Sequence, residues 1–289
     1  MTGLPKSKVV SKHGENRWVI IALLFSLFGG SCIARNVLSN TKTPAPGIGS
    51  TLVSEKDGMV LVYVPAGEFP MGSDNGNSDE NPVHKINLDS FWIDRTEVTN
   101  AMYAKCVADK DACTPPSAER SDKRDNYYGV SKFDNYPVVY VNWGQANAYC
   151  LWAERRLPTE AEWEKAARGT DGRTYPWGSE SPNAKLLNYK ANVGDTTEGG
   201  KYPDGASIYG AYDMAGNVWE WVNDWYGETY YQSSPASNPL GPDIDVFRVY
   251  RGGSWNSDDN SVRSAYRYGS GSSGTSDELG FRCARGASQ

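Results

Sequence analysis

Hydrophobic and polar positions alternate in two stretches before residue 100. Residues 58–73, GMVLVYVPAGEFPMGS, alternate and then turn at Pro65-Ala66-Gly67, which predicts a strand that leads into a hairpin. A second stretch of this kind, HKINLDSFWIDRTEVT, covers residues 84–99. The pattern therefore predicts β-structure in this part of the chain.

Helices are predicted at three places, each marked by residues that can cap its first turn. The first runs to about Ala108, the second contains WGQANAYCLWAE, and the third contains EAEWEKAAR and ends at Gly169. The capping residues are Thr99, Asn142 with Gln145, and Thr159 with Glu162. Short strands and turns follow, so we expect one α+β domain with much irregular structure.

The apolar stretch WVIIALLFSLF at residues 18–28 stands apart from this pattern. Four basic residues precede it and small residues follow it up to Cys32, which is the order of an export signal. Eleven residues are short for a membrane span, which needs ~20. The GGSC sequence resembles a bacterial lipoprotein cleavage box that would lipidate Cys32, although Gly29 stands where that box prefers Leu. An uncleaved helical anchor from Arg17 to about Ala34 is the alternative.

The sequence thus predicts three regions with different roles. Residues 1–34 are an export signal, a lipoprotein signal or a membrane anchor, and residues 35–55, rich in Ser, Thr, Pro and Gly, are a flexible tether. Residues 56–289 form the folded domain. We expect this domain to be extracytoplasmic, either anchored to the membrane through the N-terminus alone or secreted.

Composition narrows the choice of partners. The chain has 10 Trp, 18 Tyr and 30 Gly, which indicates a loop-rich core held by aromatic side chains. Four basic residues and one acid precede Cys32, so 25 of 29 basic and 34 of 35 acidic residues remain, a net charge of −9. Phosphate binding needs a basic surface, so nucleic acid is excluded as a partner.

The cysteines agree with export to an oxidising compartment. Cys106 and Cys113 lie seven residues apart and are able to close one small loop, which leaves Cys150 and Cys283 as a long-range pair. The sequence alone does not establish this connectivity.

Seven ordered blocks between Gly58 and Arg285 carry a resemblance to a known family. They are YVPAGEFPMGS, EVTNAMY, PVVYVNWGQANAYCLWAERRLPTEAEWEKAARG, YPWG, YGAYDMAGNVWEWVNDW, YRGGSW and LGFRCARG. This order resembles the formylglycine-generating-enzyme family, also called the sulfatase-modifying factor domain. The resemblance implies a C-type-lectin-like α+β fold with little regular secondary structure, and a structural disulfide between Cys150 and Cys283.

The resemblance also implies structural Ca²⁺. In DMAGNVWE the family would bind Ca²⁺ through Asp213, the carbonyls of Gly216 and Val218, and Glu220, a set of oxygens that suits the ion. The alternative is that Asp213 caps a turn and that Glu220 pairs with an arginine such as Arg251.

A second family Ca²⁺ site resembles ANVGD. It would use the Asn192 side chain, the Val193 carbonyl and Asp195. An ordinary Asx turn is the alternative for these residues.

Iron and copper are not expected. His84 is the only histidine after the export signal, so an iron centre of two or three histidines is not available within one chain. The family's oxidases hold Cu(I) with two thiolates, and their positions fall at Ser257 and near Tyr266. Because hydroxyl oxygen does not replace thiolate on Cu(I), the copper oxidase lacks its metal ligands.

The resemblance therefore indicates a family of oxidoreductases, whereas the missing cysteines favour a non-catalytic binding or accessory module at the cell surface. A divergent enzyme of the family is the alternative. The ligand would be a protein, a peptide or a glycan. The candidate groove residues are Arg251, Trp255, Ser257, Arg263 and Tyr266. The aromatics of WYGETYYQ, residues 225–232, with Tyr127 and Tyr128 are a second candidate recognition surface.

Overall fold

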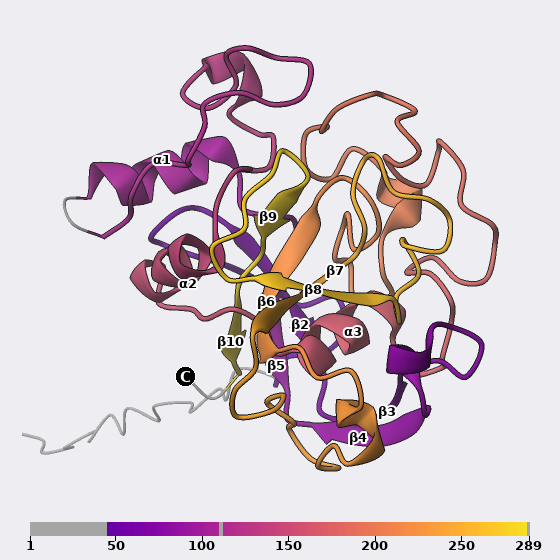
Figure 1. Ribbon diagram of the computed structural model, residues 1–289. Coiled ribbons are helices and arrows are strands. Elements are labelled where there is room, and N and C mark those ends of the chain that lie inside the picture. Colours follow the sequence, from indigo (N-terminus) through magenta and orange to yellow (C-terminus); the bar gives the residue numbers. More distant parts are fainter. Residues whose placement is uncertain (1–44, 110–111, 288–289) are drawn as a thin grey trace, which may run out of the picture. The chain divides into compact units, whose positions relative to one another are not determined.

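The computed structural model describes residues 45–109 and 112–287 (Figure 1). Within these residues, the helices are α1 (Asn100–Ala108), α2 (Trp143–Trp152) and α3 (Glu160–Arg168). The strands are β1 (Thr51–Val53), β2 (Val60–Val64), β3 (Gly67–Met71), β4 (His84–Leu88), β5 (Phe91–Asp94), β6 (Trp219–Trp225), β7 (Phe247–Arg251), β8 (Arg267–Gly271), β9 (Leu279–Phe281) and β10 (Ala284–Gly286). Single 3-10 turns occur at Ser78–Glu80, Ser131–Phe133, Pro203–Gly205 and Tyr230–Gln232. The prediction of an α+β fold with limited regular structure is confirmed.

The three predicted helices are present and begin at their predicted caps. The Thr159 hydroxyl accepts a hydrogen bond from the Glu162 amide at 3.1 Å, and the Glu162 carboxylate accepts one from the Thr159 amide at 2.8 Å. Asn142 and Gln145 make the same reciprocal pair at α2, and Thr99 caps α1. Each cap satisfies amides that the first helical turn leaves without partners.

The predicted hairpin at Pro65–Gly67 is wrong. Strand β2 pairs with β5, and β3 pairs with β4, so one two-stranded unit is nested inside the other. The Lys165 ammonium of α3 donates to the carbonyls of Pro65 and Gly67 at 2.8 and 2.7 Å. These contacts and the positive φ of 129° at Gly67 direct the chain out of the first sheet and into the second.

The strands form three sheets. Their orders are β1-β2-β5-β10, β3-β4 and β8-β7-β6-β9, and β6 pairs with β9 in parallel. Residues 51–53, which composition assigned to the tether, form β1 and pair with β2, because adding this edge strand satisfies backbone groups of β2. Helix α3 lies among the three sheets and contributes Trp163 and three alanines to their shared core (Figure 1).

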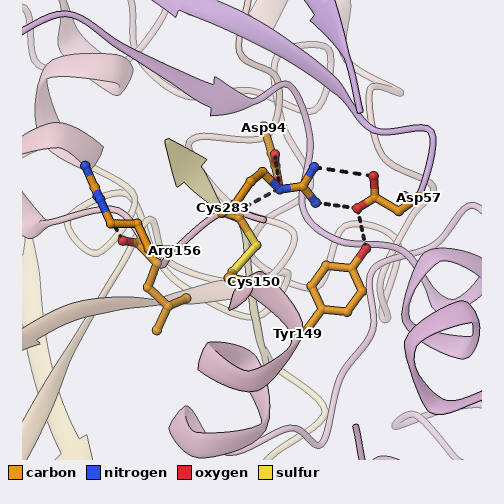
Figure 2. Close-up of a disulfide and its surroundings, with 8 residues drawn as sticks. Asp57, Asp94, Tyr149, Cys150, Arg156 and Cys283 are labelled. Carbon is orange, nitrogen blue, oxygen red and sulfur yellow. Dashed lines mark hydrogen bonds and ion pairs between the residues drawn. A yellow bond between two sulfur atoms is a disulfide. The ribbon is translucent and has the colours of Figure 1, made fainter. Parts of the chain in front are cut away.

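Both predicted disulfides are present. Cys150 of α2 bonds to Cys283, which lies between β9 and β10, and Cys106 of α1 bonds to Cys113. Figure 2 shows the first of these beside a buried polar cluster, in which Tyr149 donates to Asp57 at 2.6 Å.

Arg155 joins this cluster through two aspartates. It pairs with Asp57 and lies 3.4 Å from Asp94, whose second oxygen accepts from the Cys283 amide at 2.8 Å. Burial raises the pKa of Asp57, but the hydrogen bond and charge of Arg155 outweigh it and lower that pKa below its ordinary value. The backbone amide of Cys283 thus connects the disulfide to a buried ionic cluster between Arg155, just after α2, and Asp94 of β5.

The predicted export signal and Cys32 lie outside the described residues. Among the residues that the structure describes, no helix is long and apolar enough to cross a membrane.

Candidate functional site

The candidate site begins where β7 ends in a double-glycine turn. Gly252 and Gly253 have φ values of 95° and 75°, which side-chain-bearing residues rarely adopt. A Cβ on Gly253 would lie 2.7 Å from Val262, and one on Gly252 would lie 3.1 Å from Trp163. The turn therefore needs glycine at both positions, and it directs the chain from the buried strand to Ser254 and Ser257.

Ser254, Ser257 and Glu278 form a connected set of polar groups, which we call the serine cluster. The Ser257 hydroxyl accepts from the Ser254 amide at 2.9 Å and lies 3.2 Å from the Ser254 hydroxyl. The Ser254 hydroxyl donates to the Glu278 carboxylate. Ser257, which the sequence resemblance predicts to stand at the family's first copper thiolate position, is thus part of a network of polar groups.

A row of aromatic side chains lies beside this cluster on one face of the third sheet. Trp219 of β6 contacts Tyr250 of β7 with ring centroids 5.0 Å apart, and Tyr250 contacts Tyr268 of β8 at 5.4 Å. Tyr266 lies 5.9 Å from Trp219. We call these four residues the aromatic shelf. All four are partly or fully exposed, and Tyr268 has 50% of its surface exposed.

The shelf borders a pocket of about 240 Å³, which we call the shelf pocket. Its lining residues are Trp219, Tyr250, Ser270, Gly274, Thr275, Ser276 and Leu279. The amide of Trp219 donates to the Glu278 carbonyl at 2.7 Å, so the serine cluster and the shelf are joined by adjacent backbone.

The structure places the predicted groove residues in different environments. Tyr266 belongs to the shelf and Ser257 to the serine cluster. Trp255 is 95% buried, and its indole N–H donates to the Asp277 carbonyl at 3.3 Å. Arg263 lies next to Tyr266, but both of its terminal nitrogens donate to Glu80 at 2.6 Å.

Arg251 is not a groove residue. It has no exposed surface, and its guanidinium pairs with Glu164 and lies 3.6 Å from Glu160, both of α3. Strand alternation explains this error, because Tyr250 faces the shelf and its neighbour Arg251 must face the opposite side, toward the core.

The second predicted recognition surface is contradicted for two of its aromatic residues. Tyr231 and Tyr127 are buried, with 2% and 1% of their surfaces exposed. Tyr226 and Tyr230 pack against the main core. Tyr127 and Tyr231 are therefore core residues, whereas Tyr128, Trp225, Tyr226 and Tyr230 keep part of their surface exposed.

At the first candidate Ca²⁺ site, Glu220 is fully buried and already paired. Arg282 donates to both of its oxygens at 2.7 Å, and the Trp163 indole donates to one at 2.8 Å. Its arginine partner is therefore Arg282 rather than Arg251.

Excess negative charge remains around this pair. Asp213 accepts from the Gly200 amide at 2.6 Å, and burial raises its pKa to about 6. Burial, Asp213 and Glu220 together raise the pKa of Glu97 well above its ordinary value. One Glu97 oxygen is buried without a hydrogen-bond partner. Three carboxyl groups thus surround one guanidinium, whereas no three acidic, histidine or cysteine side chains of the described residues converge into a metal-ligand cluster.

The second candidate Ca²⁺ site does not fit the ion. The Asp195 carboxylate accepts from Ser121, Lys123 and Thr196 and pairs with Arg124 at 3.1 Å. Its lone pairs are used to hold the loop of residues 117–128.

Asn192 is equally occupied by its own turn. Its side chain accepts from the Tyr189 amide and donates to the Leu187 carbonyl, both at 3.2 Å, and the Val193 side chain points into solvent with 47% of the residue exposed.

Within residues 45–109 and 112–287, no free thiol or imidazole ligand for a soft or redox metal lies near the serine cluster. The four cysteines among the described residues are all in disulfides. His84 packs against Tyr231, with ring centroids 4.8 Å apart, at the start of β4.

Five residues of the serine cluster and the aromatic shelf were not predicted from sequence: Trp219, Tyr250, Ser254, Tyr268 and Glu278. The sequences VYR in β7 and RYG in β8 alternate tyrosine with a buried arginine. This alternation predicts that Tyr250 and Tyr268 lie on the face of the sheet opposite the arginines. No local pattern marks Glu278, whose role depends on the distant Ser254.

The chain matches the Sulfatase-modifying factor enzyme 1-like domain over residues 49–287. The chain belongs to this family. It is 37% identical to the formylglycine-generating enzyme of Streptomyces coelicolor, with 78% of this chain and 89% of that protein covered. It is 34% identical to the inactive C-alpha-formylglycine-generating enzyme 2 of Mus musculus, with 78% and 86% covered.

A longer relative and a solved structure complete the comparison. The serine/threonine-protein kinase Pkn1 of Chlamydia trachomatis is 38% identical over 78% of this chain, which spans only 38% of the length of that protein. The structure of PvdO from Pseudomonas aeruginosa superposes with a TM-score of 0.72 at 28% identity and covers 84% of this chain and 100% of PvdO. The predicted family and its C-type-lectin-like fold are confirmed.

Proposed function

We propose that this family member is a ligand-binding or accessory module at the cell surface, and that it does not act as a copper-dependent oxidase. The observation that carries the proposal is the serine cluster. Ser257 stands at the first thiolate position and is hydrogen-bonded into an oxygen network with Ser254 and Glu278. Hydroxyl and carboxylate oxygens are hard ligands that do not hold Cu(I).

The supply of thiols supports this proposal. The chain has five cysteines, of which four are in disulfides and the fifth is Cys32 in the predicted export signal. A two-thiolate copper centre would need one of the two disulfides to open, and both lie outside the serine cluster. The ligand, a protein, peptide or glycan, would bind at the aromatic shelf.

The second candidate is a divergent enzyme of the family that still converts a sulfatase cysteine to formylglycine. The 37% identity to a formylglycine-generating enzyme favours it.

An aldehyde assay distinguishes the two functions. The full chain is loaded with copper under mild reduction and offered a peptide with the Cys-x-Pro-x-Arg motif, and the aldehyde is measured by hydrazide labelling. We expect no product above a metal-free control, while the Streptomyces coelicolor relative serves as the positive control. Formation of the aldehyde would reject the binding-module proposal.

We also propose that the chain is exported and held at the membrane through Cys32. The signal-like order of residues 1–34 supports this. Metabolic labelling with a palmitate analogue should mark the wild-type chain and leave the Cys32→Ser variant unmarked. Equal labelling of both chains would exclude lipidation at Cys32.

Finally, we propose one structural Ca²⁺ beside Asp213. The ion would take the Asp213 carboxylate and the carbonyls of Gly216 and Val218, and it would offset the charge of Glu97. Chelator should lower the melting temperature of the wild type, and Asp213→Asn should abolish the difference between chelator and added Ca²⁺. The exposed Asp204→Asn variant is the control and should keep the difference. Equal melting temperatures for the wild type in chelator and Ca²⁺ would reject the site.

A further inference from the structure

The shelf pocket is lined by groups that carry no charge at neutral pH. Two aromatic rings, Leu279 and three hydroxyl-bearing residues surround it, and no Asp, Glu, Lys, Arg or His contributes to its lining. The carboxylate of Glu278, which precedes Leu279 of the lining, is turned toward Ser254 and lies 3.4 Å from the Asn256 side-chain amide nitrogen. Burial raises the pKa of the Tyr250 phenol, which keeps that group neutral.

Several polar atoms at the pocket have no partner among the described residues. Six tryptophan indoles donate to protein acceptors, namely those of Trp143, Trp152, Trp163, Trp177, Trp221 and Trp255. No such bond is made by the indole of Trp219, by the Tyr250 phenol or by the Ser270 hydroxyl within the described chain. None of these three groups is fully buried, so water or a ligand reaches them.

The three groups lie on the same face of the sheet. Tyr250 is the cross-strand partner of Trp221, two residues from Trp219, and of Tyr268, two residues from Ser270. Because side chains two residues apart in a strand share a face, the indole, the phenol and the hydroxyl lie on one face, with the Tyr250 phenol between the other two groups. Figure 1 shows their strands β6, β7 and β8 as neighbours.

We propose that the shelf pocket binds a neutral carbohydrate, an inference that rests on the proposed binding function. The two faces of a sugar ring carry C–H bonds that pack against aromatic rings, and its edge carries hydroxyls that both donate and accept hydrogen bonds. Trp219 and Tyr250 supply the ring surface, while the free indole N–H, phenol and Ser270 hydroxyl meet the sugar hydroxyls. The pocket is concave and mixed in polarity, as small-ligand sites are.

Charged ligands and extended peptides fit this pocket less well. A metal cation would need a carboxylate in the lining, and an anion would meet a protein whose residues after Cys32 have a net charge of −9. A peptide that adds a strand would use the outer edge of β8, whereas the pocket lies on the face of the sheet.

Binding of the full chain is tested with four neutral probes: hexamers of β-1,4-glucose, α-1,4-glucose, β-1,4-N-acetylglucosamine and β-1,4-galactose. The charged comparisons are hexagalacturonate and hexaglucosamine, and a neutral hexapeptide represents peptide ligands. Titration is followed by tryptophan fluorescence and calorimetry. We expect at least one neutral hexamer to bind with a Kd of about 1 mM or tighter, and the charged probes and peptide to bind at least about tenfold more weakly.

Conservative variants locate the site without removing a ring or a backbone contact. Tyr250→Phe, Ser270→Ala and Trp219→Phe should each weaken binding by about 3- to 10-fold, the effect of one lost hydrogen bond. Tyr63→Phe is the matched control, since Tyr63 contacts Trp92 at 5.1 Å in a similar edge-on pair on the first sheet, and it should leave binding unchanged.

Three results would overturn the carbohydrate site: no neutral hexamer binding at about 10 mM, stronger binding of a charged probe or the peptide, or variants that bind as the wild type does. None of these results would show that the protein is a copper-dependent oxidase. Failure of the proposed function is recognised separately, by aldehyde formation in the copper assay.

Discussion

Replacing Arg282 by Met tests how much the buried ion pair at the site stabilises the fold. The Arg282 guanidinium has no exposed surface, donates to both oxygens of Glu220, and also donates to the carbonyls of Asp94, Arg95 and Tyr212. Met fills a similar volume without the charge. The variant leaves the Glu220 carboxylate buried with only the Trp163 indole as a donor.

An unpaired buried charge costs about 3–5 kcal/mol. For a domain of this size each kcal/mol lowers the melting temperature by about 2–4 °C, so we expect a decrease of about 6–20 °C. Arg156→Met is the matched control. It breaks a bidentate pair with Glu162, both bonds being 2.6 Å, but the Arg156 side chain is 41% exposed, and its loss should cost about 0–1 kcal/mol.

Urea and thermal unfolding at pH 7 measure these changes, with disulfides intact and chelator present so that no cation replaces the guanidinium. The double variant Arg282→Met, Glu220→Gln removes both charges and should recover about half of the lost stability. The reasoning is refuted if Arg282→Met costs less than about 1 kcal/mol, or if the double variant is no more stable than the single one.

Two further predictions concern the disulfides and acid stability. Replacing Cys150 and Cys283 by Ala should lower the free energy of unfolding by about 5 kcal/mol. Replacing Cys106 and Cys113 by Ala should lower it by only about 2–3 kcal/mol, because opening the shorter loop releases less chain entropy in the unfolded state. Equal losses of stability for the two variants in urea unfolding would contradict this prediction. Asp57→Asn should cost about 2–3 kcal/mol at pH 7. Because Arg155 lowers the pKa of Asp57 in the fold, its contribution is full above the unfolded pKa of about 4 and is lost as pH falls through the folded pKa. Urea unfolding from pH 7 to about pH 2 should show the wild type and variant converging in acid, and a constant gap would refute the assignment.

Local chemistry made part of this protein predictable from sequence. The caps at Thr99, Asn142 and Thr159 act within three residues of each helix start, so adjacent side chains suffice to predict them. The family and fold followed from ordered blocks that cover most of the chain.

Choices among distant partners needed the tertiary structure. The alternating stretches of β2, β3, β4 and β5 predicted strands correctly but not their nested pairing, because either pairing buries the same apolar residues. Glu220 required an arginine or a cation, and only packing brought Arg282, 62 residues away, to it.

The serine cluster and the aromatic shelf were likewise predicted only in part from the sequence. The sequence by itself predicted that the family's copper thiolate positions fall at Ser257 and near Tyr266. Only the fold brought Glu278 to Ser254 and aligned Trp219, Tyr250 and Tyr268 on one sheet face, because strand register and a double-glycine turn decide which side chains meet.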